Sequence, residues 1–317
     1  MEELASIIVG IFALSGGSRM VVNNATLIAQ RFDVSDLFIG LTILAFGTDL
    51  PELLISIRGA INNLQGTESS GVIVGNAIGS SVTQISLVLG ITAWIRYLNV
   101  GKRQTFTLTI ELLGSCLLLF LVGLDGTISR VDGIILLTAF IIYLVASFRT
   151  SRGGVSSKPE TKPKPVWQAL LLLAVGLIIV ISGAEVTVQS AISLSKTWGI
   201  KQSFVGAVII GLGTSLPELA ISLQSIAQKN MQLSIGNIIG SNIFDLLVPI
   251  GTGATISTLQ FGSDNLWFDL PFLFVITAII LWFLSRKRGL QHWEGIVMVV
   301  MYLIYVAVKF FFPATIP

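Results

Sequence analysis

Two glutamates occupy matching places in a repeated motif, and each lies within a long apolar run. The sequence Gly-Thr-Asp-Leu-Pro-Glu at Gly47–Glu52 returns as Gly-Thr-Ser-Leu-Pro-Glu at Gly213–Glu218. In both copies the threonine and the glutamate are four residues apart, so on a helix their side chains would project from one face. The two pairs are Thr48 with Glu52 and Thr214 with Glu218. Each copy therefore offers a hydroxyl and a carboxylate to one place in an apolar environment.

A second motif repeats downstream of the first. Gly-Asn-Ala-Ile-Gly-Ser at Gly75–Ser80 returns as Gly-Asn-Ile-Ile-Gly-Ser at Gly236–Ser241. The same four-residue spacing joins Ser80 to Gln84 and Ser241 to Asp245. Four helical segments could thus bring hydroxyls, an amide and carboxylates together.

The prolines of the first motif add backbone oxygens to this set. Pro51 and Pro217 remove a helical hydrogen bond and so free carbonyl groups in the glycine-containing turn before them. Oxygen-only ligands suit hard cations such as Ca²⁺, whereas soft metals prefer sulfur or imidazole. The sequence therefore predicts a site for a hard cation.

Each feature alone also has a structural explanation. A proline often kinks a membrane helix, a hydroxyl often bonds to its own helix, and glycines often serve helix packing. Two carboxylates at equivalent positions of a repeat are harder to explain in this way, because an ionisable group inside a membrane is expensive. The pattern favours a functional interpretation.

Composition predicts an all-α integral membrane protein. The chain is 53% hydrophobic and 11% charged, with a mean hydropathy of +0.86, against about 25% charged in soluble domains. The net charge of +2 gives no indication of nucleic-acid binding, and the single cysteine, Cys116, excludes an intrachain disulfide. The acidic start of the chain predicts no cleavable signal peptide.

Hydropathy divides the chain into ten spans, most of them near the roughly 20 residues that cross a bilayer. The expected spans of the first half are Leu4–Gln30, Leu37–Ile61, Gly71–Ile95, Phe106–Leu124 and Gly133–Phe148. Those of the second half are Trp167–Leu194, Phe204–Ile226, Leu233–Leu259, Phe268–Leu284 and Gly295–Phe312.

The two halves align by position. Glu52 and Glu218 are 166 residues apart, and Ser80 and Ser241 are 161 apart. Because each half has an odd number of spans, the second half would enter the membrane from the opposite side, giving two inverted five-helix repeats. We expect the first repeat at 1–148, a linker at 149–165 and the second repeat at 166–317.

Basic residues predict the orientation. With the Arg- and Lys-containing linker in the cytoplasm, thirteen basic residues lie inside, five outside, and Arg19 lies within the first span. The positive-inside rule then places both termini outside the cell, with the protein in the plasma membrane.

At its two motif pairs the chain resembles the cation/Ca²⁺ exchanger superfamily, and within it the compact prokaryotic sodium/calcium exchanger-like membrane proteins. The resemblance covers nearly the whole chain and implies ten helices, a central ion cluster, and movement of helices one and six against the other eight. The family's metal-binding positions fall here on Ala45, Thr48, Asp49, Glu52, Ser80, Gln84, Gly211, Thr214, Ser215, Glu218, Ser241 and Asp245.

Two of these positions depart from the family pattern. Asp49 stands where such exchangers usually carry a serine, and Gln84 stands where an Asn or Asp is usual. One divalent ion would leave two of the four negative charges at the site uncompensated, which is costly at membrane depth. Protons, additional Na⁺ ions or Arg19 could compensate them, while Arg19 could equally snorkel or pair locally.

The leading hypothesis is a secondary-active antiporter, not an enzyme, that exchanges Ca²⁺ for Na⁺. H⁺ coupling and Mg²⁺ transport remain alternatives, and a cation channel is less favoured because an inverted repeat with broken helices suits two alternating states. We expect no cofactor beyond the transported ions, and inorganic cations and the lipid bilayer as partners. Neither nucleic acid nor an obligatory protein partner is expected.

Overall fold

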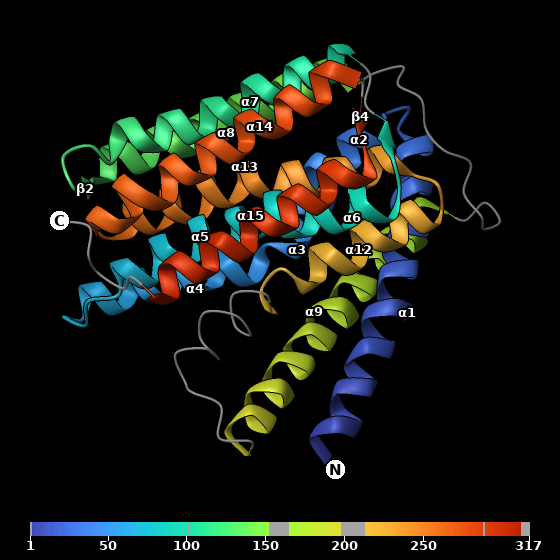
Figure 1. Ribbon diagram of the computed structural model, residues 1–317, viewed down its shortest axis with the longest axis horizontal. Coiled ribbons are helices and arrows are strands. Elements are labelled where there is room, and N and C mark those ends of the chain that lie inside the picture. Colours follow the sequence, from blue (N-terminus) through green and yellow to red (C-terminus); the bar gives the residue numbers. More distant parts are fainter. Residues whose placement is uncertain (1, 100–101, 152–164, 198–212, 288, 312–317) are drawn as a thin grey trace.

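The structure is a computed structural model that describes residues 2–99, 102–151, 165–197, 213–287 and 289–311. The described chain is almost entirely helical, with π-helical turns labelled η (Figure 1). Its first half contains α1 (Glu2–Arg31), α2 (Asp36–Ile39), η1 (Gly40–Leu44), α3 (Ala45–Thr48), α4 (Leu50–Leu64), α5 (Ser70–Thr83), η2 (Gln84–Val88), α6 (Leu89–Ile95), α7 (Lys102–Val122) and α8 (Arg130–Ser151). Its second half contains α9 (Val166–Thr197), α12 (Leu216–Ala227), α13 (Met231–Ile256), η4 (Asn265–Asp269), α14 (Leu270–Lys287) and α15 (His292–Phe311).

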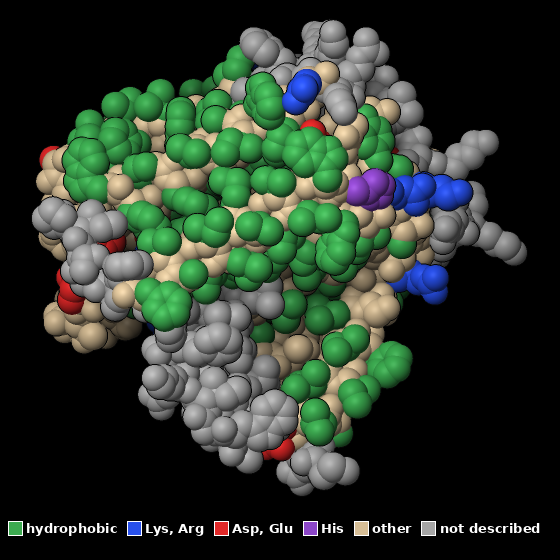
Figure 2. Space-filling model, in the orientation of Figure 1, with side chains coloured by type: hydrophobic (Ala, Val, Ile, Leu, Met, Phe, Trp, Pro, Cys, Tyr) green, Lys and Arg blue, Asp and Glu red, His purple; other side chains and the backbone are tan. Residues whose placement is uncertain are grey.

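The helices have the length and composition of membrane spans. Within the described residues, seven are long and apolar enough to cross a bilayer, or eight if the bent pair Asp36–Thr48 and Leu50–Leu64 is one span. Large apolar side chains such as Phe12 and Trp167 are exposed by 73% and 68%, and hydrophobic side chains cover much of the face in Figure 2, with Lys and Arg at its margins. An apolar exterior of this extent is typical of a protein surrounded by lipid.

Each predicted span overlaps a helix. The boundaries agree within a few residues, although α7 contributes only Ile110–Val122 as a shorter apolar helix. The predicted span Phe204–Ile226 is described only from residue 213 onward, where α12 follows. All-α membrane architecture is therefore confirmed.

The two helices that carry the second motif lie at the centre of the bundle. The most apolar part of Met231–Ile256 is 100% buried and that of Ser70–Ile95 is 78% buried, against 28% for α1, α8 and α15. At Gly240 the backbone of α13 approaches that of η1 closely, because a Cβ atom on Gly240 would lie only 2.6 Å from the Cα of Leu41. Small residues allow backbones in a membrane to approach in this way.

Helices α1 and α9 lie side by side and are inclined away from the other helices (Figure 1). Glycines bring the two backbones into contact: a Cβ on Gly10 would lie 2.8 Å from the carbonyl oxygen of Gly183, and one on Gly17 would lie 3.0 Å from that of Gly176. Gly16 is exposed instead. Gly17 and Gly183 therefore form part of a close interface between these two helices.

Two short antiparallel strand pairs join the halves of the chain. β1 (Leu98–Asn99) pairs with β4 (Gly289–Leu290), with Leu98 opposite Leu290, and β2 (Thr127–Ile128) pairs with β3 (Leu259–Gln260), with Ile128 opposite Leu259. The labels β2 and β4 lie at opposite ends of the bundle in Figure 1. Each end is thus fastened by one strand from each half.

Candidate functional site

The first motif lies at a break in the helix. α3 ends at Thr48 and α4 begins at Leu50, and the segment Asp36–Thr48 is bent by 47° relative to Leu50–Leu64. Asp49 occupies the break with φ −89° and ψ 9°. Pro51 explains the position, because it lacks the N–H that would continue the hydrogen-bond ladder. The interruption predicted from Pro51 thus lies between Thr48, the last residue of α3, and Glu52, in the first turn of α4.

The second copy repeats this geometry. Ser215 has φ −94° and ψ 6°, and α12 begins at the next residue with Pro217 in its first turn. Glu52 and Glu218 consequently lie in the first turns of α4 and α12. A helix N-terminus carries partial positive charge, which stabilises a carboxylate there.

Both glutamate side chains are deeply buried. Glu52 is 1% exposed and Glu218 is 0% exposed, and none of their four carboxylate oxygens has a partner with full hydrogen-bond geometry, although Ser80 lies near Glu52, and Thr48 and Asp49 lie near Glu218. Buried charged groups are normally paired or bound to metal ions. These oxygens are therefore the strongest indication of a cation site in the described chain.

Two aspartates join the glutamates. Glu52 lies close enough to Glu218 for the two carboxyl groups to interact electrostatically, and Asp49 lies likewise within reach of Asp245 and both glutamates. Asp49 and Asp245 are 0% exposed, and each has one carboxylate oxygen without a partner. Four acidic side chains from both halves of the chain are thus gathered in one buried region.

Direct hydrogen bonds connect the halves around these acids. The Ser80 and Thr214 hydroxyl oxygens are 3.5 Å apart, and Gln84 Nε2 donates to Asp245 Oδ2 at 3.1 Å. Gln84 is the first residue of η2, and π turns of this kind are frequent at functional sites. The repeat-equivalent residues Gln84 and Asp245 therefore meet, and Ser80 of the second motif meets Thr214 of the first.

The other predicted ligands differ in their present bonding. The Ala45 carbonyl accepts from the Asp49 N–H at 3.0 Å and from the Thr48 hydroxyl at 3.3 Å. The hydroxyls of Ser215 and Ser241 are buried without a partner. Gly211 lies outside the described residues.

Arg19 does not compensate the acids in this structure. It is exposed on α1, whereas Asp49 is fully buried with Oδ2 unpartnered and Oδ1 accepting from the Thr48 hydroxyl at 3.4 Å. Among the described residues, no three His, Cys, Asp or Glu side chains stand close enough to hold a metal ion by themselves. The polar side chains gathered at the site are therefore of mixed type: carboxyl, amide and hydroxyl groups.

Sequence reasoning did not identify the asparagine beside this cluster. Asn242 is 0% exposed, and its Nδ2 donates to Gln84 Oε1 at 3.2 Å. The sequence feature that could have identified Asn242 is its spacing from Asp245: the two residues are three apart, so on a helix their side chains lie on the same face.

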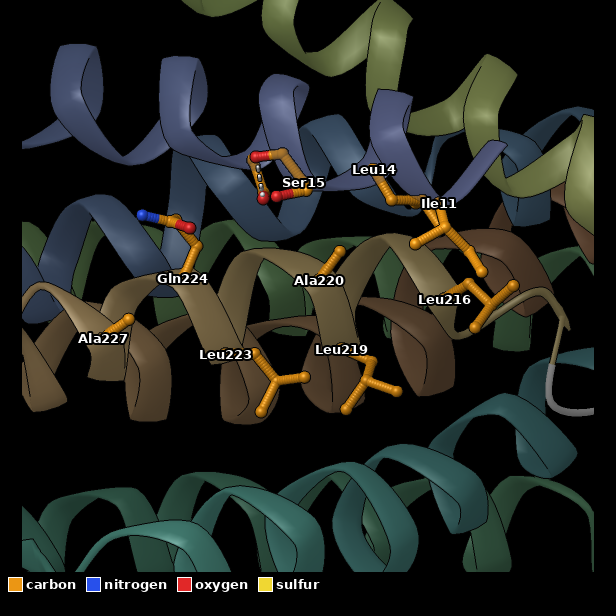
Figure 3. A pocket seen from close by; sticks show the side chains of 10 residues that line it. Ile11, Leu14, Ser15, Leu216, Leu219, Ala220, Leu223, Gln224 and Ala227 are labelled. Atoms are coloured by element: carbon orange, nitrogen blue, oxygen red, sulfur yellow. Dashed lines mark hydrogen bonds between the residues drawn. The ribbon is translucent and has the colours of Figure 1, made fainter. Parts of the chain in front are cut away.

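A groove lies between α1 and α12, the helix that carries Glu218. Its volume is about 410 Å³. Figure 3 shows Leu216, Ala220 and Gln224 of α12 along one side of it and Ile11, Leu14 and Ser15 of α1 along the other. The lining is mainly apolar, with polar groups from Ser15, Ser18 and Gln224.

Comparisons with known proteins agree with this architecture. The chain is 32% identical over 300 residues to the uncharacterized membrane protein MJ0091 of Methanocaldococcus jannaschii, covering 95% of each chain. It is 24% identical to the sodium/calcium exchanger MaX1 of Methanosarcina acetivorans, over 96% of this chain and 97% of that one. A solved structure of the sodium-calcium exchanger NCX_Mj, soaked with zero Na⁺ and Ca²⁺, matches with a TM-score of 0.83 and 31% identity, over 96% of this chain and 98% of that one.

The family model for the sodium/calcium exchanger protein matches residues 3–149 and 168–311, which together make up most of the chain. The match includes both copies of both motifs and the helices that bury their carboxylates. The chain belongs to the sodium/calcium exchanger protein family, whose members are multi-pass membrane cation antiporters.

Proposed function

We propose that this protein exchanges Ca²⁺ for Na⁺ across the plasma membrane by alternating access. The observation that carries the proposal is the pair Glu52 and Glu218: the two residues are repeat-equivalent, buried and close to each other, and none of their carboxylate oxygens makes a hydrogen bond of full geometry. A divalent cation between them would compensate the charges of both carboxylates. Relatives named sodium/calcium exchangers support Ca²⁺ and Na⁺ as the ions.

The proposed ligand set is the one that the family resemblance implies. Its members are Ala45, Thr48, Asp49, Glu52, Ser80, Gln84, Gly211, Thr214, Ser215, Glu218, Ser241 and Asp245. The carboxylate, hydroxyl and carbonyl oxygens among them meet the preference of Ca²⁺ for 6–8 oxygens, while Gln84 Nε2 donates to Asp245 Oδ2 in this structure. Because four acids converge, several Na⁺ ions could replace one Ca²⁺ with a similar total of positive charge.

The proposed architecture is ten helices in two inverted repeats, 1–148 and 166–317, joined by the linker 149–165. The strand pairs support this architecture. β1 and β3 begin 161 residues apart, which is also the offset between Gln84 and Asp245, so the two strands are repeat-equivalent. Each of them pairs with a strand from the other half of the chain. An inverted repeat would place two such equivalent strand pairs at opposite ends of the molecule. Both termini would lie outside the cell.

The moving element in this proposal is the pair α1 and α9. The two helices contact each other through glycine backbones, and residues of α1 and α12 line a groove of about 410 Å³ between these two neighbouring helices. If the pair α1 and α9 moved along α12, the buried carboxyl groups would become accessible to water first from one side of the membrane and then from the other.

Ion flux in proteoliposomes tests the function. Ca²⁺ uptake should be driven by an outward Na⁺ gradient and should stop when Na⁺ is replaced by choline. A pH gradient should not replace the Na⁺ gradient, and external Mg²⁺ should compete weakly. Uptake driven by the pH gradient alone, or Mg²⁺ uptake in place of Ca²⁺, would reject Na⁺/Ca²⁺ exchange in favour of H⁺ coupling or Mg²⁺ transport.

A further inference from the structure

A chain of two hydrogen bonds runs through three buried polar residues beside the acids. Asn242 Nδ2 donates to Gln84 Oε1 at 3.2 Å, and Gln84 Nε2 donates to Asp245 Oδ2 at 3.1 Å. All three side chains are 0% exposed. Asn242 and Asp245 lie on α13, while Gln84 comes from η2 in the other half of the chain.

A backbone carbonyl fixes the direction of this chain. Asn242 Nδ2 also donates to the Ile238 carbonyl at 2.8 Å, and a carbonyl can only accept. The amide nitrogen of Asn242 must therefore point toward Ile238 and Gln84. The Gln84 atom that it meets must be the oxygen, so the nitrogen of Gln84 is the atom that faces Asp245.

This direction changes what Gln84 offers to a cation. Its oxygen is occupied by Asn242, and its nitrogen occupies Oδ2 of Asp245, so that only Oδ1 of Asp245 is left without a partner. If the Gln84 amide were turned over, its oxygen and both oxygens of Asp245 would be available as cation ligands.

We propose that Asn242 is a positioning residue that sets cation affinity by holding Gln84 as a hydrogen-bond donor to Asp245 instead of as an oxygen ligand. This inference rests on the proposed exchange function. It assigns to Asn242 an indirect role: the residue acts on the transported ion through the orientation of a neighbouring amide. The repeat-equivalent residue of Asn242, 161 residues earlier, is Ser81, whose side chain has no amide group. This means of orienting a neighbouring amide is therefore present in the second repeat only.

The test is the KM for Ca²⁺ in Asn242→Leu, measured by Na⁺-dependent uptake in proteoliposomes. Leucine has a similar size but cannot donate, so Gln84 should turn its oxygen toward the ion and the KM should fall about fivefold, the equivalent of one neutral hydrogen bond. The maximal rate should change less than the KM. The same substitution in a Gln84→Met background should leave the KM unchanged, because there is no amide to turn.

Matched variants separate this role from a general packing effect. Ser81→Ala removes a buried hydroxyl at the equivalent position and should leave the KM unchanged. If Asn242→Leu unfolds, Asn242→Ser serves instead, because its hydroxyl would bond to the Ile238 carbonyl and not to Gln84.

An unchanged KM in a folded Asn242 variant, or the same KM shift in both backgrounds, would overturn the positioning role. Failure of the proposed function looks different, because the unsubstituted protein would then show no Na⁺-dependent Ca²⁺ uptake at all.

Discussion

Asp49 is the residue at which this chain differs most informatively from its own second repeat. The equivalent position is Ser215, and both residues occupy a helix break with nearly the same backbone angles. A hydroxyl is therefore compatible with this conformation, so the backbone does not require the carboxylate. Asp49 Oδ2 is buried without a partner and close to three other acids, where a negative charge on Asp49 would act directly on a bound cation.

We expect Asp49→Ser to change which ions the protein uses. Removing one negative charge from the cluster should weaken competition by Mg²⁺ and reduce the pH dependence of transport, because one titratable group is lost. The measurement is Ca²⁺ uptake against a series of Mg²⁺ concentrations and pH values.

Arg19→Gln is the matching control for this prediction. Since Arg19 is exposed and makes no bond to Asp49, its substitution should leave ion competition unchanged. If both variants instead lost stability together while selectivity stayed constant, Asp49 would have a structural role and not a selective one.

At this scale the sequence predicted the acids but not their surroundings. The repeated motifs were sufficient to identify Glu52, Glu218 and their partners, because charge in an apolar segment is rare. The proposed role of Asn242 depends on how η2 packs against α13, which the spacing of Asn242 and Asp245 alone does not predict. An interruption before Pro51 was expected from the sequence, but the 47° angle between Asp36–Thr48 and Leu50–Leu64 was not, because a membrane proline can be accommodated in several ways.

Among the elements, the pair α1 and α9 depends on glycine. A Cβ atom on Gly183 would lie 2.9 Å from the Cβ of Ala13 and 3.1 Å from the Gly10 carbonyl oxygen, whereas Gly16 is exposed. We expect Gly183→Val to destabilise the protein by about 1–3 kcal/mol through overpacking. Gly16→Val should cost much less. Thermal unfolding in detergent measures both, and equal losses would contradict the close contact.

The groove between α1 and α12 allows a test of movement. Cysteines at Ser15 and Ala220, which line opposite sides, can be joined by a bifunctional reagent after Cys116→Ala removes the native thiol. Cross-linking should stop exchange while Ca²⁺ binding persists, because the ligands stay in place but cannot change sides. Normal turnover after complete cross-linking would show that another element moves.

Helix positions were the most predictable part of the fold. Spans such as Leu4–Gln30 and Gly71–Ile95 agree with Glu2–Arg31 and Ser70–Ile95, since apolar length alone sets them. The central place of α13 was not predictable in the same way, because a buried and a lipid-facing membrane helix are both apolar. The π turns η1 and η2 also left no signal in hydropathy.

For the whole molecule, the distribution of basic residues predicts a cytoplasmic linker. A single cysteine introduced at Ser156 in the Cys116→Ala background should react with a membrane-impermeant maleimide only after the cell membrane is opened. Labelling of intact cells at this position would reverse the proposed orientation without affecting the site itself.

The central claim is that Glu52 and Glu218 together bind the transported divalent cation between the two halves of the chain. Its most direct measurement is Na⁺-driven Ca²⁺ uptake into proteoliposomes by Glu52→Gln and Glu218→Gln, compared with Glu111→Gln, a half-buried glutamate on α7 outside the cluster. Glutamine keeps the shape of the side chain and removes its charge. Both cluster variants should remain folded and lose uptake, while Glu111→Gln retains it. Near-normal uptake by either folded cluster variant would contradict the claim.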